Sequence, residues 1–206
     1  MDESKWQAWL SDWNQILIEA FQTHSSGIQS ATVQSIPPSG WLGEPGATPQ
    51  ELDVFEAKLN VKLPPSYRSF LAASNGFEQP GCFVPRIFST SEVAWLKDSD
   101  PAGITAWIEG ENYGGPPTAI LDDNYFVYDE NQRTEILRTE HLWQCLQISA
   151  REEAGTAVYL LNPAVKFPDG EWEAWFWAHW LPGARRYRSF WDMMQEERQS
   201  FIELSE

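Results

Sequence analysis

The feature that most constrains the fold is an aromatic run near the end of the chain, EWEAWFWAHW, at residues 171–180. Side chains alternate between the two faces of a β-strand, so the run divides into two sets. The first set is predicted to be core: Trp172, Ala174, Phe176, Ala178 and Trp180. The second begins polar and becomes aromatic: Glu171, Glu173, Trp175, Trp177 and His179. Two adjacent exposed tryptophans would form an unusual apolar patch. We therefore expect Trp175 and Trp177 to be covered as well, by the N-terminal helix.

Helical periodicity appears at both ends of the chain and after residue 48. Residues 4–22 place Trp6, Trp9 and Trp13 on one stripe, which favours a packing ridge over a binding site. The Ser-, Gln- and Pro-rich residues 23–40 predict a linker. TPQE at 48–51 is a capping box that starts a second helix. LPPSYRSFLAASNG predicts a third helix that stops at Asn75-Gly76, and SFWDMMQEERQSFIEL predicts a closing helix.

Between Gly76 and the aromatic run, β-branched and aromatic residues alternate with turn residues. The pieces FVPRIFS, TAWIEGEN, TEILRT and AVYLLN are predicted to be extended. LDDNYF predicts a tight hairpin between strands near 118–121 and 125–128. Short helices near 90–96 and 139–152 are expected to interrupt this β-rich part.

Two blocks of motifs carry a resemblance to a known family. The first runs from Trp41-x-Gly43 through the capped helix with Glu51 and Glu56 to Leu63-Pro64, Tyr67, Phe70-Leu71 and Asn75-Gly76. The second is YLLNP at 159–163 followed by residues 170–194. Together they frame residues 40–195, and in this order they resemble the SUKH superfamily, the Smi/Knr-type domain.

The resemblance implies an α+β fold with a mixed, largely antiparallel sheet flanked by helices. It implies a SUKH-like domain at 39–206, preceded by an added N-terminal helix and linker at 1–38. It also implies no family-wide catalytic residues. Bacterial members commonly neutralise a toxin, often a nuclease, whereas fungal and animal members act as regulatory or adaptor domains.

The formal net charge of −16 argues against direct nucleic-acid binding, which needs clustered Lys and Arg. It fits a basic protein partner, although solubility alone is an alternative explanation. Residues 92–130 hold nine acidic residues and one base, Lys97, so this segment contributes −8. We predict that the partner-binding residues lie there: Glu109, Glu111, Asp122, Asp123, Asp129 and Glu130.

Other chemistries are less well supported by the residues. The histidines, His24, His141 and His179, lack ligand spacing, and His141 with Cys145 would give a metal two ligands at most. Glu171 and Glu173 beside tryptophans suggest a carbohydrate-active site. Side chains on one strand point in parallel, however, so a solvated strand end is favoured. The basic cluster RRYR at 185–188 favours internal ion pairs over phosphate binding. We predict no catalytic, metal-binding or cofactor-binding residues, and no enzyme.

Two distant cysteines, the absence of a signal-peptide pattern and the absence of a long apolar run predict a cytoplasmic protein that does not cross a membrane. The leading hypothesis is an immunity or antitoxin-like protein that blocks a basic toxin domain through an acidic surface. The rival hypothesis is a regulatory adaptor of the cell-wall-regulator type.

Overall fold

The computed structural model describes residues 2–23, 36–111, 119–151 and 157–205. Its helices are α1 (Glu3–Thr23), α2 (Pro49–Leu59), α3 (Pro65–Ala73), α4 (Leu96–Ser99), α5 (Pro101–Glu111), α6 (Asp122–Tyr125), the 3₁₀ helix η2 (Thr139–Gln144) and α7 (Phe190–Ser205). Its strands are β1 (Phe77–Glu78), β2 (Arg86–Ile87), β3 (Ala94–Trp95), β4 (Leu146–Gln147), β5 (Ala157–Lys166), β6 (Trp172–Ala178) and β7 (Ala184–Tyr187).

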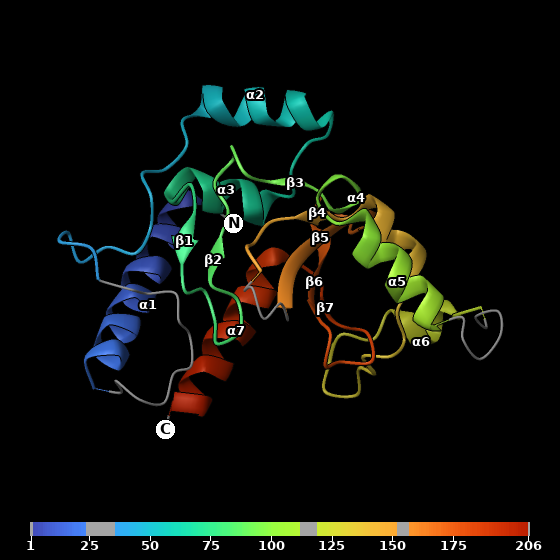
Figure 1. Ribbon diagram of the computed structural model, residues 1–206. Helices are drawn as coiled ribbons and strands as arrows, with labels where there is room; N and C mark the ends of the chain where they lie inside the picture. Colours follow the sequence, from blue (N-terminus) through green and yellow to red (C-terminus); the bar gives the residue numbers. More distant parts are fainter. Residues whose placement is uncertain (1, 24–35, 112–118, 152–156, 206) are drawn as a thin grey trace.

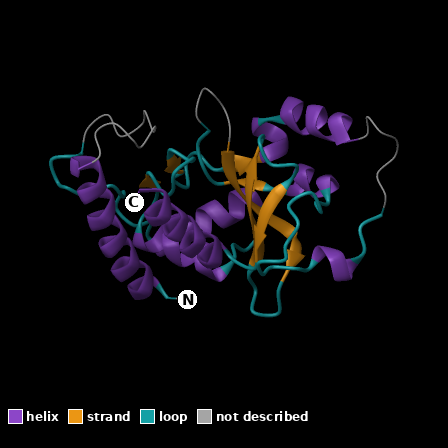
Figure 2. Cartoon of the chain, turned by 90° about the horizontal axis from the view of Figure 1, so that it is seen from below, coloured by secondary structure: helices purple, strands orange, loops and turns teal. Residues whose placement is uncertain are grey.

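The fold is a sheet between two groups of helices. Five strands follow the order β3-β4-β5-β6-β7, and β1 and β2 form a separate pair. Figure 1 shows α1, α3 and α7 on one side of the large sheet and α4, α5 and α6 on the other. Figure 2 shows the same division from below. All pairs of described strands are antiparallel, so the predicted α+β class is confirmed.

Residues 172–178 of the aromatic run form β6, an interior strand of the sheet whose seven residues are all buried. It pairs with β5 in a register that sets Phe176 against Tyr159 and Trp175 against Leu160. On its other edge it pairs with β7. Aromatic and β-branched side chains pack well on a pleated surface that is covered on both sides. The prediction of a strand buried on both faces is confirmed.

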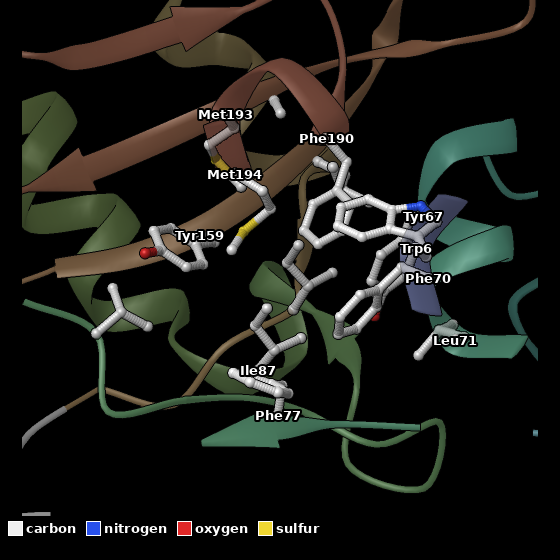
Figure 3. Close-up of a cluster of buried hydrophobic side chains, with 14 of the residues drawn as sticks. Trp6, Tyr67, Phe70, Leu71, Phe77, Ile87, Tyr159, Phe190, Met193 and Met194 are labelled. Atoms are coloured by element: carbon white, nitrogen blue, oxygen red, sulfur yellow. The ribbon is translucent and has the colours of Figure 1, made fainter. Parts of the chain in front are cut away.

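One face of β6 belongs to the larger core, which gathers residues far apart in the sequence. Trp172, Ala174, Phe176 and Ala178 lie in it, as predicted. Figure 3 shows Trp6 of α1 beside Tyr67 and Phe70 of α3 and Phe190 of α7. The Trp6 ring is fully buried, and its Nε1 donates to the Ser66 carbonyl at 2.8 Å. The tryptophan stripe of α1 is therefore a packing ridge, as predicted. Trp180, by contrast, is 44% exposed, so its prediction as core is wrong.

The other face of β6 is covered too, but by elements other than those expected. Trp175 and Trp177 pack in a second core with Leu96 of α4 and Ile104 of α5. The Trp107 ring meets Trp177 edge-on, with 5.1 Å between the ring centroids. The prediction that α1 covers these tryptophans is wrong, because α1 packs with α3 and α7 on the opposite side of the sheet.

Local capping signals fix the ends of α2 and α3. Thr48 and Glu51 form the predicted capping box, with Glu51 N donating to Thr48 Oγ1 and Thr48 N to Glu51 Oε2. The first turn of α3 is capped instead by a distant residue, since Glu171 accepts from Ser66 N at 2.8 Å and from Ser66 Oγ at 2.6 Å. The α3 helix ends at Ala73, two residues before the predicted stop, because Ser74 is extended.

Several predicted strands are wrong. LDDNYF is not a hairpin: its residues 122–125 form α6. TAWIEGEN falls mostly in α5, where Trp107 and Ile108 pack against the second core from a helix. TEILRT is irregular and makes one sheet-edge bond, from Ala184 N to the Thr134 carbonyl. The helix predicted near 90–96 is misplaced, because residues 94–95 form β3 and α4 begins only at residue 96. The helix predicted near 139–152 is confirmed only in its first part, as η2, which ends at residue 144 before β4. Tertiary packing overrides the β-propensity of these pieces.

A buried carboxylic acid lies between α7 and β5. Glu197 accepts a hydrogen bond from Tyr159 Oη at 2.7 Å, and Gly81 packs directly against both side chains. Burial raises the pKa of Glu197 to about 7. Because the pKa of Glu197 is higher in the folded state than the unfolded value of 4.5, its contribution to the free energy of unfolding is fully present below pH 4.5. This contribution is lost as the pH rises toward 7.

We expect Glu197→Gln to flatten this pH dependence. Glutamine is neutral throughout, so the loss of unfolding free energy between about pH 4.5 and pH 7 should shrink by on the order of 3 kcal/mol. Urea denaturation at several pH values in this window measures it. Glu196→Gln, next along α7 and paired with Arg185 at the surface, is the control. Equal pH slopes for wild type and Glu197→Gln would contradict the assignment.

Candidate functional site: a braced acidic segment

The structure divides the six predicted partner-binding residues into two groups. Glu109 is exposed on α5, and Glu111 is the last residue of that helix, of which the backbone alone is described. The other four are exposed on residues 119–132, which we call the acidic segment: Asp122, Asp123, Asp129 and Glu130. Figure 2 shows α5 and α6 apart on the same side of the sheet. The acidic segment is therefore the larger group and the one built around α6.

The acidic segment is fastened to the sheet by a buried carboxylate, Glu173 of β6. Tyr125 Oη and Tyr128 Oη each donate to it at 2.8 Å. Trp175 Nε1 donates to it at 2.6 Å and Asn162 Nδ2 at 3.0 Å. Burial, together with the adjacent carboxylate, raises the pKa of both tyrosines, so their hydroxyls remain donors. The interpretation of Glu173 as a solvated strand end is wrong, because its carboxylate is fully buried. We call Glu173 the hub, since it accepts hydrogen bonds from all four of these side chains.

Arg186 of β7 balances the charge of Glu173. Its Nη1 lies 3.7 Å from Glu173 Oε1, and both side chains are fully buried. It also donates to the Tyr125 carbonyl, and its guanidinium lies over the Tyr125 ring, 4.3 Å from the ring centroid. Within the described residues its Nε and Nη2 make no hydrogen bond. A buried charge of this kind is tolerated when its counter-ion is held close, so Glu173 and Arg186 depend on each other.

Two more side chains fix the segment at its ends. Gln132 acts as a partner for the edge strand β7, accepting from Arg186 N and donating to the Arg186 carbonyl, both at 2.8 Å. Arg138 donates to Asp122 and to the Ile120 carbonyl, and it stacks over the Tyr125 ring at 4.4 Å. The acids on this segment are therefore presented by a backbone that is already ordered.

The neighbouring histidine and cysteine are structural. Asn162 Nδ2 lies 3.0 Å from His141 Nδ1, and the His141 ring stacks on Trp175. Burial lowers the pKa of His141, which favours the neutral ring, and raises that of the Cys145 thiol. In the described parts of the chain, no group of three or more His, Cys, Asp or Glu side chains could hold a metal ion.

The carboxylates of the carbohydrate hypothesis are both used by the fold. Glu171 caps α3 through Ser66, and Glu173 is the hub of the acidic segment. Glu171 is 9% exposed, so its interpretation as part of a solvated strand end is also wrong. Two of the three arginines of the RRYR cluster form the predicted ion pairs within the chain: Arg185 pairs with Glu196 at 2.8 Å and Arg186 with Glu173. Arg188 lies instead over the Phe167 ring, 4.5 Å from its centroid.

A second acidic feature is a cleft of about 260 Å³ beside β1 and β2. Its charged lining residues are Glu44, Glu78, Arg86 and Glu92. Arg86 donates to both carboxylate oxygens of Glu92 and holds the pKa of Glu92 at about 2, while burial raises the pKa of Glu78. Sequence reasoning missed Glu44 and Glu78 because the two lie far apart along the chain.

Sequence reasoning also missed the hub and two exposed apolar residues of the acidic segment, Leu121 and Phe126. The one available signal was the pair of glutamates in an otherwise aromatic strand. An acid in a buried strand implies donors around it, but three of the four donors lie outside β6 and cannot be named from that strand.

The model of the SMI1/KNR4 family (SUKH-1) matches residues 46–196, most of the chain. Comparison with curated proteins returns no significant match. Within the described residues, no helix is both long enough and apolar enough to span a membrane.

Proposed function

The chain belongs to the SMI1/KNR4 family (SUKH-1), and from this premise we propose that it is an immunity protein that binds and blocks a basic toxin domain. Family membership supports a protein-binding role of the immunity or regulator kind, generally without catalysis. The specific partner and surface are our proposal. The observation that carries it is the braced acidic segment, in which four exposed acids stand on a backbone held by Glu173.

Charge complementarity gives this segment a partner class. Asp122 is paired with Arg138, but among the described residues the carboxylates of Asp123 and Glu130 make no hydrogen bond or ion pair. With a chain charge of −16, such a surface attracts cationic proteins and repels nucleic acid. Opposite charges raise the association rate and select against wrong partners.

Bracing also lowers the cost of binding. Ordering a loop on association costs free energy for each side chain and backbone residue that is immobilised. Here the segment is already ordered when the chain folds, through the hydrogen bonds of Tyr125, Tyr128, Gln132 and Arg138. To inhibit the toxin, this chain then needs only to cover a cationic cleft of the toxin domain, and it need not catalyse any reaction. The proposal includes a cytoplasmic location, where the toxin would act.

The partner can be identified by site-specific crosslinking. A photo-crosslinking residue replaces Asp123, on the acidic segment, or Glu203, exposed on α7, on the other side of the sheet. In source cells we expect a basic protein to be captured from position 123 and not from position 203. The captured protein should arrest growth when expressed alone, and co-expression of this chain should restore growth. A captured protein that is harmless alone would favour the regulatory adaptor instead.

Charge reversal tests the surface directly. With the purified partner, we expect Asp123→Lys/Glu130→Lys to weaken binding by about tenfold or more and to reduce the salt dependence of the Kd. Calorimetric titration at several salt concentrations measures both. Glu3→Lys/Glu203→Lys changes net charge equally on exposed positions of α1 and α7 and should bind almost normally. Equal weakening by both pairs would show a general charge effect and would contradict the acidic segment as the contact surface.

A further inference from the structure

Two large apolar side chains are exposed within the acidic segment. Leu121, which precedes α6, is 66% exposed, and Phe126, which follows it, is 42% exposed. Single exposed apolar residues are normal on protein surfaces. These two differ because they bracket a helix of one turn that carries Asp122 and Asp123, with Asp129 and Glu130 next along the chain.

The backbone around both residues is fixed. The Leu121 carbonyl accepts from Asn124 N and Tyr125 N, and Phe126 N donates to the Asp122 carbonyl at 2.9 Å. The Phe126 ring meets the buried Tyr125 ring edge-on at 5.2 Å. Arg138 lies over the same Phe126 ring, 5.5 Å from its centroid. Little backbone conformational entropy therefore remains to be lost if a partner covers these side chains.

We infer that Leu121 and Phe126 are the apolar anchors of the docking surface. The occupant is a cationic protein segment that presents one large apolar side chain among Arg and Lys residues. Stable interfaces combine an apolar centre with a polar rim, and a few anchors supply most of the binding energy. The four acids of this segment match the charge of that occupant. This inference rests on the proposed function and adds the apolar half of the recognition.

Two synthetic peptides separate the apolar contribution from the charge contribution. Both have the same length and the same number of arginines, and they differ in one central residue, leucine or serine. We expect the wild-type chain to bind the leucine peptide about fivefold more tightly, as partial burial of a large apolar side chain would give. Leu121→Ala/Phe126→Ala should remove this preference and leave the weaker, salt-dependent binding. Titrations followed by amide NMR shifts measure both affinities and map the contact.

The chain supplies a matched control. Leu204, 64% exposed on α7, and Phe83, 43% exposed before β2, have the same residue types and nearly the same exposure. Leu204→Ala/Phe83→Ala should therefore retain the preference for the leucine peptide. All four substitutions are at the surface, so near-ultraviolet circular dichroism should show an unchanged fold in both variants.

The results of the peptide titrations can contradict the apolar anchors separately from the acidic docking surface. Equal binding of both peptides, abolished by Asp123→Lys/Glu130→Lys, would overturn the apolar anchors and leave the acidic surface standing. A leucine preference that survives Leu121→Ala/Phe126→Ala, or shifts that map to the Glu44–Glu78 cleft, would also overturn the anchors. A chain that binds neither peptide would overturn both.

Discussion

Replacement of Glu173 by alanine is expected to lower the free energy of unfolding by about 3–5 kcal/mol, because it leaves a buried cation without its counter-ion. Arg186 would remain in the interior with its partner removed, and both side chains are fully buried in the wild type. The hydroxyls of Tyr125 and Tyr128 would lose their acceptor as well. Chemical denaturation monitored by tryptophan fluorescence measures the change.

Two comparisons make this expectation specific. Glu203→Ala removes an exposed acid of α7 and should change stability by about 0.5 kcal/mol or less. Glu173→Gln keeps the shape but not the charge, so it should remain clearly destabilising. In the alanine variant, amide hydrogen exchange should rise most in residues 119–132. A loss below about 1 kcal/mol, or unchanged exchange in that segment, would contradict the role of Glu173 as hub.

The hub joins the fold to the proposed function. Glu173 cannot touch a partner, since its side chain is fully buried. Yet it holds Tyr125 and Tyr128, which lie between the two pairs of exposed acids, Asp122-Asp123 and Asp129-Glu130. A variant that folds but lacks the hub should therefore bind a cationic partner more weakly with all its surface acids in place. Under this interpretation the buried Glu173 determines how the exposed acids of the acidic segment are arranged.

Parts of this arrangement could be predicted from short sequence patterns. The alternation in β6, the stripe of α1 and the capping box of α2 are local signals, and each depends on residues within one element. The position of the acidic residues on the exterior also followed from composition, because unpaired carboxylates are rarely buried. The α+β class itself was predicted from the family resemblance, and these local signals agree with it.

What could not be predicted depends on contacts between distant residues. Three of the four donors to Glu173 stand outside β6, at positions 125, 128 and 162, so β6 alone shows only Trp175 as a partner for the carboxylate. The wrong hairpin at LDDNYF has the same cause. Tyr125 has the β-propensity of an aromatic residue and was predicted to lie in a strand. In the structure it lies in the helix α6, and its hydroxyl donates to Glu173. The helices that cover Trp175 and Trp177 could not be predicted either, because local sequence patterns do not show on which side of the sheet a helix packs.

The last prediction concerns the N-terminal helix, whose division from the rest of the chain at residue 38 stays a proposal. Replacement of Trp6 by alanine should lower the free energy of unfolding by about 3–5 kcal/mol, because it leaves a cavity where α1 meets α3 and α7. The Trp6 ring is fully buried, with ring centroids 5.3 Å from Phe70 and 5.5 Å from Phe190.

Trp180→Ala is the matched control for Trp6→Ala, since Trp180 is 44% exposed and should cost about 1 kcal/mol or less. Urea denaturation of both variants measures the difference. If α1 were an appendage that docks weakly, Trp6→Ala would release the helix and leave the main transition unchanged. If α1 is part of the core, the whole chain should unfold earlier in one transition. Because Trp6 contacts α3 and α7 together, we expect the single transition.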